Sequence, residues 1–163
     1  MARSIDELRS DLSVMEERDF DLSHIDANGL ERLWKICDDL EGHPVEIVAP
    51  LLLSFIERFA APAKIDARYD LGTPGPLVHT LEALPGYEPW LLESIRRRPA
   101  PLSLWMLNRI LNALPDGQAY DEHLALLRSV SGRSDVTSAT AAEATAYLEH
   151  QTASRGERGR GDA

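Results

Sequence analysis

The sequence has almost no cysteine and no long apolar run, and each shortage excludes a class of protein. Cys37 is the only cysteine among 163 residues, so no intrachain disulfide can form and a secreted, disulfide-stabilised fold is excluded. The longest apolar stretch, residues 47–55, is interrupted by Pro50 and Ser54 and is too short to span a bilayer. Residues 1–12 are rich in charge and lack the apolar core of a signal peptide. We therefore expect a cytoplasmic protein without membrane segments.

Positive charge is also in short supply. The chain has 27 acidic and 17 basic residues, a formal net charge of -10. Nucleic-acid binding needs a basic surface, so a direct nucleic-acid partner is disfavoured. Residues 1–41 hold 12 acidic and 5 basic side chains, whereas residues 95–133 hold 3 acidic and 6 basic ones. An acidic front part would steer a basic partner protein, and two ordinary solvated faces are the alternative explanation.

What the chain does contain is the composition of a folded globular protein. Hydrophobic residues make up 44% and charged residues 27%. The length suits one domain, to which we assign residues 1–152. Residues 155–161 offer no apolar side chain to a core, which predicts a disordered tail over residues 153–163.

Apolar residues recur at helical spacing between turns rich in proline and glycine. The pattern predicts helices near residues 4–18, 28–41, 44–59, 77–84, 89–98, 102–114, 120–130 and 141–151, with a loop over 61–71. Ser4 with Glu7 is typical of a capping box, and Pro50 predicts a kink or a break near Glu46. No strand-like alternation is sustained. The fold class is therefore all-α, either an antiparallel helical bundle or a short HEAT-like stack of helical hairpins.

The residue types of catalytic and metal sites are present but not clustered. The five histidines lie at no familiar metal-binding spacing from one another or from Cys37, so we expect no metal and no cofactor. Cys37 lies on an apolar helix face, which favours core packing. His79 precedes Glu82 by one helical turn, and a structural hydrogen bond is the favoured interpretation. We therefore expect that the protein is not an enzyme. The alternative is an enzyme whose active site is assembled from Cys37, His79 and Glu82.

Two sets of residues are candidates for binding a partner. The helix predicted from Asn28 carries an apolar face of Leu30, Leu33, Trp34, Cys37 and Leu40 opposite its charges. The acidic candidates on and just after this helix are Glu31, Asp38, Asp39 and Glu41. The second set shares one face of the helix near residues 102–114 and consists of Asn108, Arg109 and Asn112, beside Trp105. This polar stripe could form the floor of a binding groove, a solvent face, or a row in which the asparagines tie adjacent loops.

Two stretches carry a resemblance to a known class of proteins. The run Leu71-Gly72-Thr73-Pro74-Gly75-Pro76-Leu77-Val78-His79, followed later by Trp105-Met106-Leu107-Asn108-Arg109-Ile110, resembles the small helical immunity proteins encoded beside bacterial polymorphic toxins. The resemblance implies an intracellular antidote that binds one toxin domain, without a cofactor, and blocks its active site or the entry of its substrate. It assigns no toxin-contacting residue.

The charge and the resemblance together predict stoichiometric inhibition of a cognate toxin protein. An acidic antidote suits a toxin with a basic active site, such as a nuclease, because electrostatic steering accelerates their encounter. A HEAT-like scaffold or regulatory subunit without inhibitory activity would use the same helical faces and is the alternative function. The oligomeric state is left open by the sequence.

Overall fold

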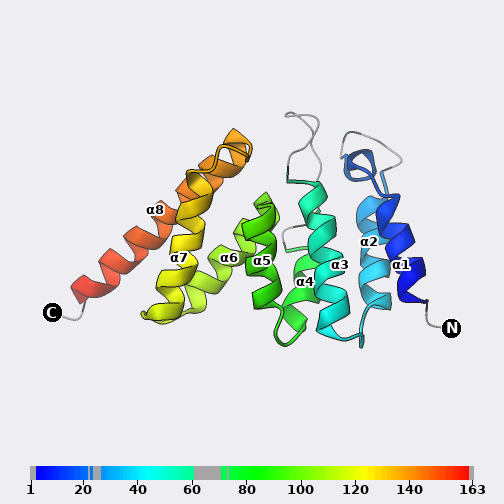
Figure 1. Cartoon of the computed structure of the whole chain (residues 1–163), viewed down its shortest axis with the longest axis horizontal. Coiled ribbons are helices and arrows are strands. Elements are labelled where there is room, and N and C mark those ends of the chain that lie inside the picture. Colours follow the sequence, from blue (N-terminus) through cyan, green and yellow to red (C-terminus); the bar gives the residue numbers. More distant parts are fainter. Residues whose placement is uncertain (1–2, 22, 24–26, 61–70, 73, 162–163) are drawn as a thin grey trace. The chain divides into compact units, whose positions relative to one another are not determined.

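The chain is all-helical in the residues that the structure describes. The computed structural model describes residues 3–21, 23, 27–60, 71–72 and 74–161, with side chains as far as Arg155. Within these residues there are eight α-helices, one 3-10 helix and no strand, and 73% of the chain is helical (Figure 1). The all-α prediction is confirmed. The helices form two compact units, Met1–Leu91 (the N-terminal unit) and Leu92–Ala163 (the C-terminal unit).

The first helix of the N-terminal unit, α1 (Ile5–Ser13), begins at the predicted capping box. The Glu7 backbone N–H donates to Ser4 Oγ at 3.3 Å, and the Ser4 N–H donates to the Glu7 carboxylate at 2.7 Å. The helix ends at Ser13, so the predicted end near Arg18 is wrong. A separate 3-10 helix, η1 (Glu17–Phe20), follows.

The early end of α1 has a tertiary cause. The guanidinium of Arg58, from the end of α3 (Val45–Arg58), donates to the backbone carbonyl of Leu12 at 2.7 Å and to that of Met15. Helix-terminal carbonyls need such partners because no further turn satisfies them. Met15 itself is fully buried. A residue more than 40 positions away in the sequence therefore helps to fix where the first helix stops.

Four helices and η1 bury the core of the N-terminal unit. Helix α2 (Gly29–Asp39) contacts α1, η1 and α4 (Pro76–Ala83), while α3 contacts α1 and α4. Successive helices of this unit alternate in direction in Figure 1, as the short predicted turns require. The largest fully buried side chains of the unit are Leu8, Met15, Leu33, Leu40, Leu52, Leu53, Ile56, Leu77, Leu81 and Leu91.

Helix α3 runs unbroken through Pro50, so a break near Glu46 does not occur. Proline cannot donate the usual backbone bond within the helix. Burial of the neighbouring side chains compensates, because Val48, Ala49, Leu52 and Leu53 are each at most 1% exposed. The predicted loop after α3 lies outside the described residues except for Leu71.

A tight turn before α4, one of the turns rich in proline and glycine that the sequence predicts, depends on two glycines. Gly72 has φ +85°, a left-handed conformation that favours glycine. A Cβ atom on Gly75 would lie 2.5 Å from the Leu71 carbonyl oxygen and 2.6 Å from the Gly72 Cα. Two backbone segments therefore approach each other more closely than any side chain at Gly75 allows.

Replacing Gly75 with alanine should lower the free energy of unfolding by about 2 kcal/mol, because the backbone must move to admit a methyl group. Gly132→Ala is the matched control, because the nearest atom to its added Cβ lies 4.0 Å away. We expect the control to change stability by less than about 0.5 kcal/mol. Urea unfolding monitored by circular dichroism measures both, and equal stabilities of the two variants would contradict the close approach at Gly75.

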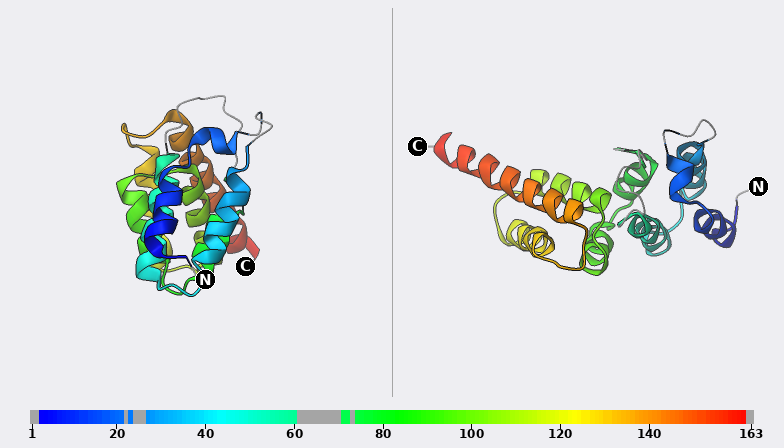
Figure 2. Two further views of the ribbon diagram at one scale, coloured as in Figure 1. Left: turned by 90° about the vertical axis from the view of Figure 1, so that its right-hand side faces the viewer. Right: turned by 90° about the horizontal axis from the view of Figure 1, so that it is seen from above.

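In the C-terminal unit, α7 and α8 lie side by side and both contact α6 (Figures 1 and 2). The unit boundary falls within α5. The helices are α5 (Glu88–Arg97), α6 (Pro101–Ala113), α7 (Gln118–Ser131) and α8 (Ser138–Gly161). Leu104, Leu107, Leu111, Leu127, Val130 and Ala144 are fully buried between them. Helices α6 and α7 match the predicted ranges to within a few residues.

Helix α8 is longer than predicted at its C-terminal end. The structure continues it to Gly161, so the predicted end near Gln151 is wrong, and the helix extends into residues 153–163, for which the sequence predicts a disordered tail. Two polar side chains hold this part of α8. The Gln151 amide is fully buried, and its Nε2 donates to Oδ1 of both Asn108 and Asn112 at 2.7 Å. The Tyr120 hydroxyl donates to Gln151 Oε1 at 3.4 Å.

Arg155 adds a second attachment one turn further along α8. Its guanidinium donates to the Leu114 carbonyl at the end of α6 at 2.8 Å and forms an ion pair with Asp116. It also lies over the Tyr120 ring, 3.7 Å from the centroid. These are polar contacts between distant residues, which the apolar periodicity of the sequence does not reveal.

Substituting Gln151 with alanine should destabilise the C-terminal unit by about 2 kcal/mol or more, because three hydrogen bonds are lost in a buried place. Gln118→Ala is the control: this glutamine also forms a side-chain bond within the unit, to Glu122, but on an exposed surface. The control should lose less than about 0.5 kcal/mol. Similar losses in the two variants, measured by urea unfolding, would refute the structural role of Gln151.

Candidate interaction surface

The acidic candidates on α2 do not all face solvent. Glu31 and Asp38 are exposed, as is Glu41 just beyond the helix. Asp39 is half-buried and pairs with Arg3 across a 3.5 Å distance, and Arg3 also pairs with Asp11 of α1. Asp39 is therefore engaged in an ion pair within the N-terminal unit, and the other three predicted residues lie at the surface.

One exposed carboxylate is partly neutralised and two are not. The Lys35 ammonium lies 2.7 Å from the Glu31 carboxylate, four residues along the helix, and this hydrogen bond lowers the pKa of Glu31. Asp38 and Glu41 form no ion pair with any residue that the structure describes. Their charges remain available to a partner.

Trp34 lies in the same stripe as these carboxylates. Positions 31, 34 and 38 are spaced three and four residues apart, which brings their side chains to one side of α2, and Glu41 follows just beyond the end of the helix. The indole is 41% exposed, although the sequence assigned Trp34 to the apolar face with Leu33 and Cys37. It stacks on the imidazole of His79 from α4, with ring centroids 5.8 Å apart and planes 29° from parallel. We call Glu31, Trp34, Asp38 and Glu41 the α2 surface.

The charge of the chain is divided unequally between the two units. The N-terminal unit has 18 acidic and 8 basic residues, whereas the C-terminal unit has 9 of each. The whole net charge of -10 therefore belongs to the N-terminal unit. The polarity that the sequence indicated between its front and its later part coincides with a structural division.

Cys37 and His79, two residues of the alternative catalytic site, make different contacts. The pKa of the Cys37 thiol is raised from 9.0 to about 11, mainly by burial; a hydrogen bond with Thr80 opposes the rise, and the charge of Asp38 adds to it. A thiol with this pKa is protonated at neutral pH and is a poor nucleophile. His79 is exposed and stacked on Trp34. Cys37 thus has the environment of a core thiol, as the sequence suggested.

The polar stripe on α6 is largely occupied by contacts within the C-terminal unit. Asn108 and Asn112 both accept hydrogen bonds from Gln151. Arg109 is exposed, with its guanidinium 4.9 Å from the centroid of the Trp105 ring. This arrangement favours the interpretation in which the asparagines tie a neighbouring segment, and that segment is helix α8 instead of a loop. Asn108 and Asn112 are therefore weaker binding candidates than the α2 surface.

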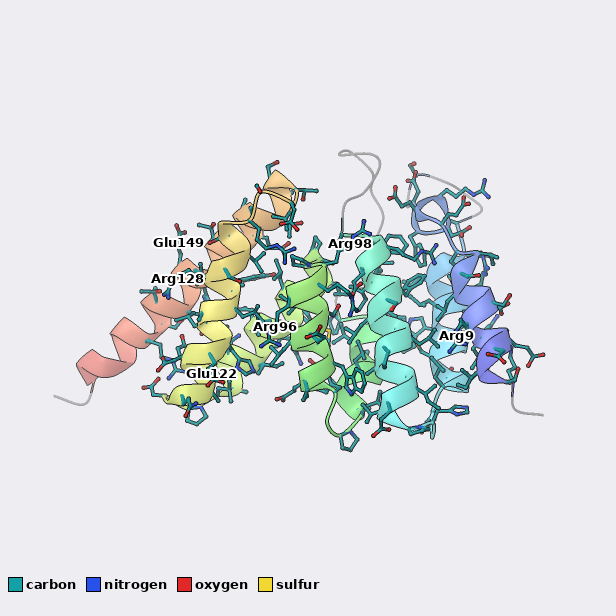
Figure 3. The ribbon with its side chains drawn as sticks, in the orientation of Figure 1. Arg9, Arg96, Arg98, Glu122, Arg128 and Glu149 are labelled. Carbon is teal, nitrogen blue, oxygen red and sulfur yellow. The ribbon has the colours of Figure 1, made fainter. Side chains whose placement is uncertain are left out.

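Basic side chains gather at the end of α5. Arg96, Arg97 and Arg98 are exposed, and Figure 3 labels the first and last of them. Arg133 donates to the carbonyl of Arg96 at 2.8 Å and pairs with Asp135, which raises the pKa of Arg133. The C-terminal carbonyls of α5 are thus capped by a side chain from beyond α7.

The described residues hold neither a cluster of metal ligands nor a helix that could cross a membrane. Among them, no group of three or more His, Cys, Asp or Glu side chains is placed to hold a metal ion. None of the helices in this part of the chain combines the length and the apolar character that a membrane crossing requires.

Comparison with known proteins gives no assignment. No protein-family model, no curated protein and no solved structure matches the chain. The fold and the surface thus define a class only: an all-helical protein with an acidic N-terminal unit that exposes a tryptophan among carboxylates.

The burial of Cys37 predicts a loss of stability at alkaline pH. The folded-state pKa of the thiol, about 11, lies above its ordinary value of 9.0. The contribution of the protonated thiol to the free energy of unfolding is therefore complete below pH 9.0 and is lost as the pH rises to about 11. Over that window the free energy of unfolding should fall by about 1.4 kcal/mol per pH unit more in the parent protein than in Cys37→Ala. Parallel urea titrations of the two proteins measure this difference, and parallel pH profiles would contradict it.

Proposed function

We propose that the protein binds a basic partner protein through the α2 surface and inhibits it stoichiometrically. The partner we propose is a bacterial toxin domain with a basic active site, such as a nuclease, for which this chain acts as the immunity protein. The observation that carries the proposal is the confinement of the whole net charge of -10 to the unit that exposes Trp34 among carboxylates.

The physical basis is complementarity of charge followed by burial of an aromatic side chain. A strongly negative unit attracts a basic surface from a distance, and such steering raises association rates by about 10- to 1000-fold at low salt. Once the surfaces meet, an exposed tryptophan supplies the large buried area typical of interface hot spots. An inhibitor of this kind needs no chemistry of its own, because it only has to cover the substrate-binding surface.

The direct test uses the polypeptide encoded by the adjacent gene as the probe. The two purified proteins are mixed at micromolar concentration and examined by size-exclusion chromatography with light scattering, and the partner's enzymatic activity is assayed with increasing amounts of this chain. We expect a complex of one copy each and complete inhibition at equimolar ratio. A complex without inhibition would favour the scaffold function instead, and the absence of any complex would refute the proposal.

Charge reversal tests which surface is used. The double substitution Asp38→Lys and Glu41→Lys should slow association with the partner by about tenfold or more at low salt and weaken the salt dependence of the rate. The control is Glu149→Lys together with Glu122→Lys, which makes the same charge change on α8 and α7 of the C-terminal unit (Figure 3).

The control should change the association rate by less than about threefold, since its charges belong to the unit with no net charge. Stopped-flow fluorescence at several salt concentrations gives the rates. Equal slowing by the two double variants would mean that only total charge matters, and the α2 surface would lose its assigned role.

A further inference from the structure

The stacked pair of Trp34 and His79 is a distinctive feature of the exposed surface. Val14, Trp34, Ile47 and Trp90 are the large apolar side chains that the described residues expose. Of these four, Trp34 is held by a ring from another helix, since His79 lies against it at 5.8 Å between centroids. Stacking limits the motion of the indole, so less conformational entropy is lost when a partner covers it.

The residues around Trp34 determine which kind of chemical group binds favourably on its indole. Glu31 precedes it by three residues and Asp38 follows by four, so carboxylates lie on both sides of the indole along α2. An aromatic face attracts a cation through its π electrons, and the negative charge of Asp38 adds to this attraction, whereas Glu31 adds less because Lys35 partly neutralises it. Asp38 is exposed and forms no ion pair with the residues that the structure describes. An anionic or purely apolar group would gain less from this environment.

Among cations, a guanidinium fits better than an ammonium. It is planar, so it can stack on the indole while its N–H groups donate to a carboxylate in the same plane. The protein already stacks arginine on aromatic rings: Arg109 lies 4.9 Å from the Trp105 ring centroid and Arg155 lies 3.7 Å from that of Tyr120. A lysine ammonium is more strongly hydrated and lacks the stacking plane.

We infer that Trp34, supported by His79 and flanked by Glu31 and Asp38, is an anchor site for an arginine side chain on the basic partner. This inference rests on the proposed function in taking the partner to be a basic protein, and it adds the side chain that is recognised. The occupant is a surface arginine of that protein, seated on the indole and paired with Asp38.

The first test uses hexa-arginine and hexa-lysine peptides with blocked termini as probes. Isothermal titration at low salt should give about tenfold tighter binding of hexa-arginine to the parent protein. The preference should fall below about twofold in Trp34→Leu and persist in Trp34→Phe, which keeps an aromatic ring. Trp90→Leu is the matched control, since Trp90 is 37% exposed, and it should keep the full preference.

A second measurement needs no variant that could fail to fold. The chain has three tryptophans, whose indole N–H signals can be resolved and assigned by nuclear magnetic resonance. Hexa-arginine should shift the Trp34 signal and leave those of Trp90 and Trp105 nearly unchanged. Equal affinity of the parent protein for the two peptides, a preference that survives in Trp34→Leu, or a shift centred on another tryptophan would each overturn the anchor.

These outcomes separate the anchor from the proposed function. If the peptide preference depends on Trp34 but the partner forms no complex, the proposed function fails and the arginine site stands. If the partner is inhibited with parent-like affinity by Trp34→Leu, the anchor fails and the proposed function stands. In the outcome we expect, Trp34→Leu weakens the partner complex by about 30-fold or more, as loss of an interface hot spot does.

Discussion

The packing of α2 against its neighbours determines what the N-terminal unit can present. Leu33, Ile36, Cys37 and Leu40 are at most 3% exposed and form the side of the helix that faces the core. With that side fixed, helical geometry leaves Glu31 and Asp38 outside and Trp34 at the edge, and Glu41 is exposed just beyond the helix. The same packing brings α4 close enough for His79 to stack on Trp34. The surface that we assign to binding is thus a consequence of how the core is built.

In the C-terminal unit, polar side chains attach the last helix to its neighbours. In the N-terminal unit, the helices are held together mainly by apolar side chains. Gln151 and Arg155 attach α8 to α6 and α7 through hydrogen bonds, an ion pair and a stacked guanidinium. Buried polar groups stabilise a single arrangement only when each of them has partners. Asn108 and Asn112 supply such partners, and their amide oxygens are therefore committed to holding α8.

The unequal division of charge means that the two units differ in how strongly they attract a basic partner. The N-terminal unit carries an excess of acidic residues, and a basic molecule would be drawn to it first. The C-terminal unit has equal numbers of acidic and basic residues, so its surface offers local patterns of charge and no net attraction. A partner that binds through charge and one exposed indole would therefore meet the N-terminal unit, and substitutions there and in the C-terminal unit should have separable effects.

The sequence by itself determined the helical class, most helix starts and the acidic character of the front part, because these follow from local spacing, capping residues and composition. Ser4 with Glu7, and the turn at Gly72 and Gly75, were recognisable because their physics involves neighbours in the chain. Tertiary structure alone decided that α1 stops at Ser13, that α8 continues past Gln151, that Asp39 pairs with Arg3, and that Trp34 is exposed. Each of these depends on side chains distant in the sequence, such as Arg58, Asn108 and His79, whose approach no local pattern encodes.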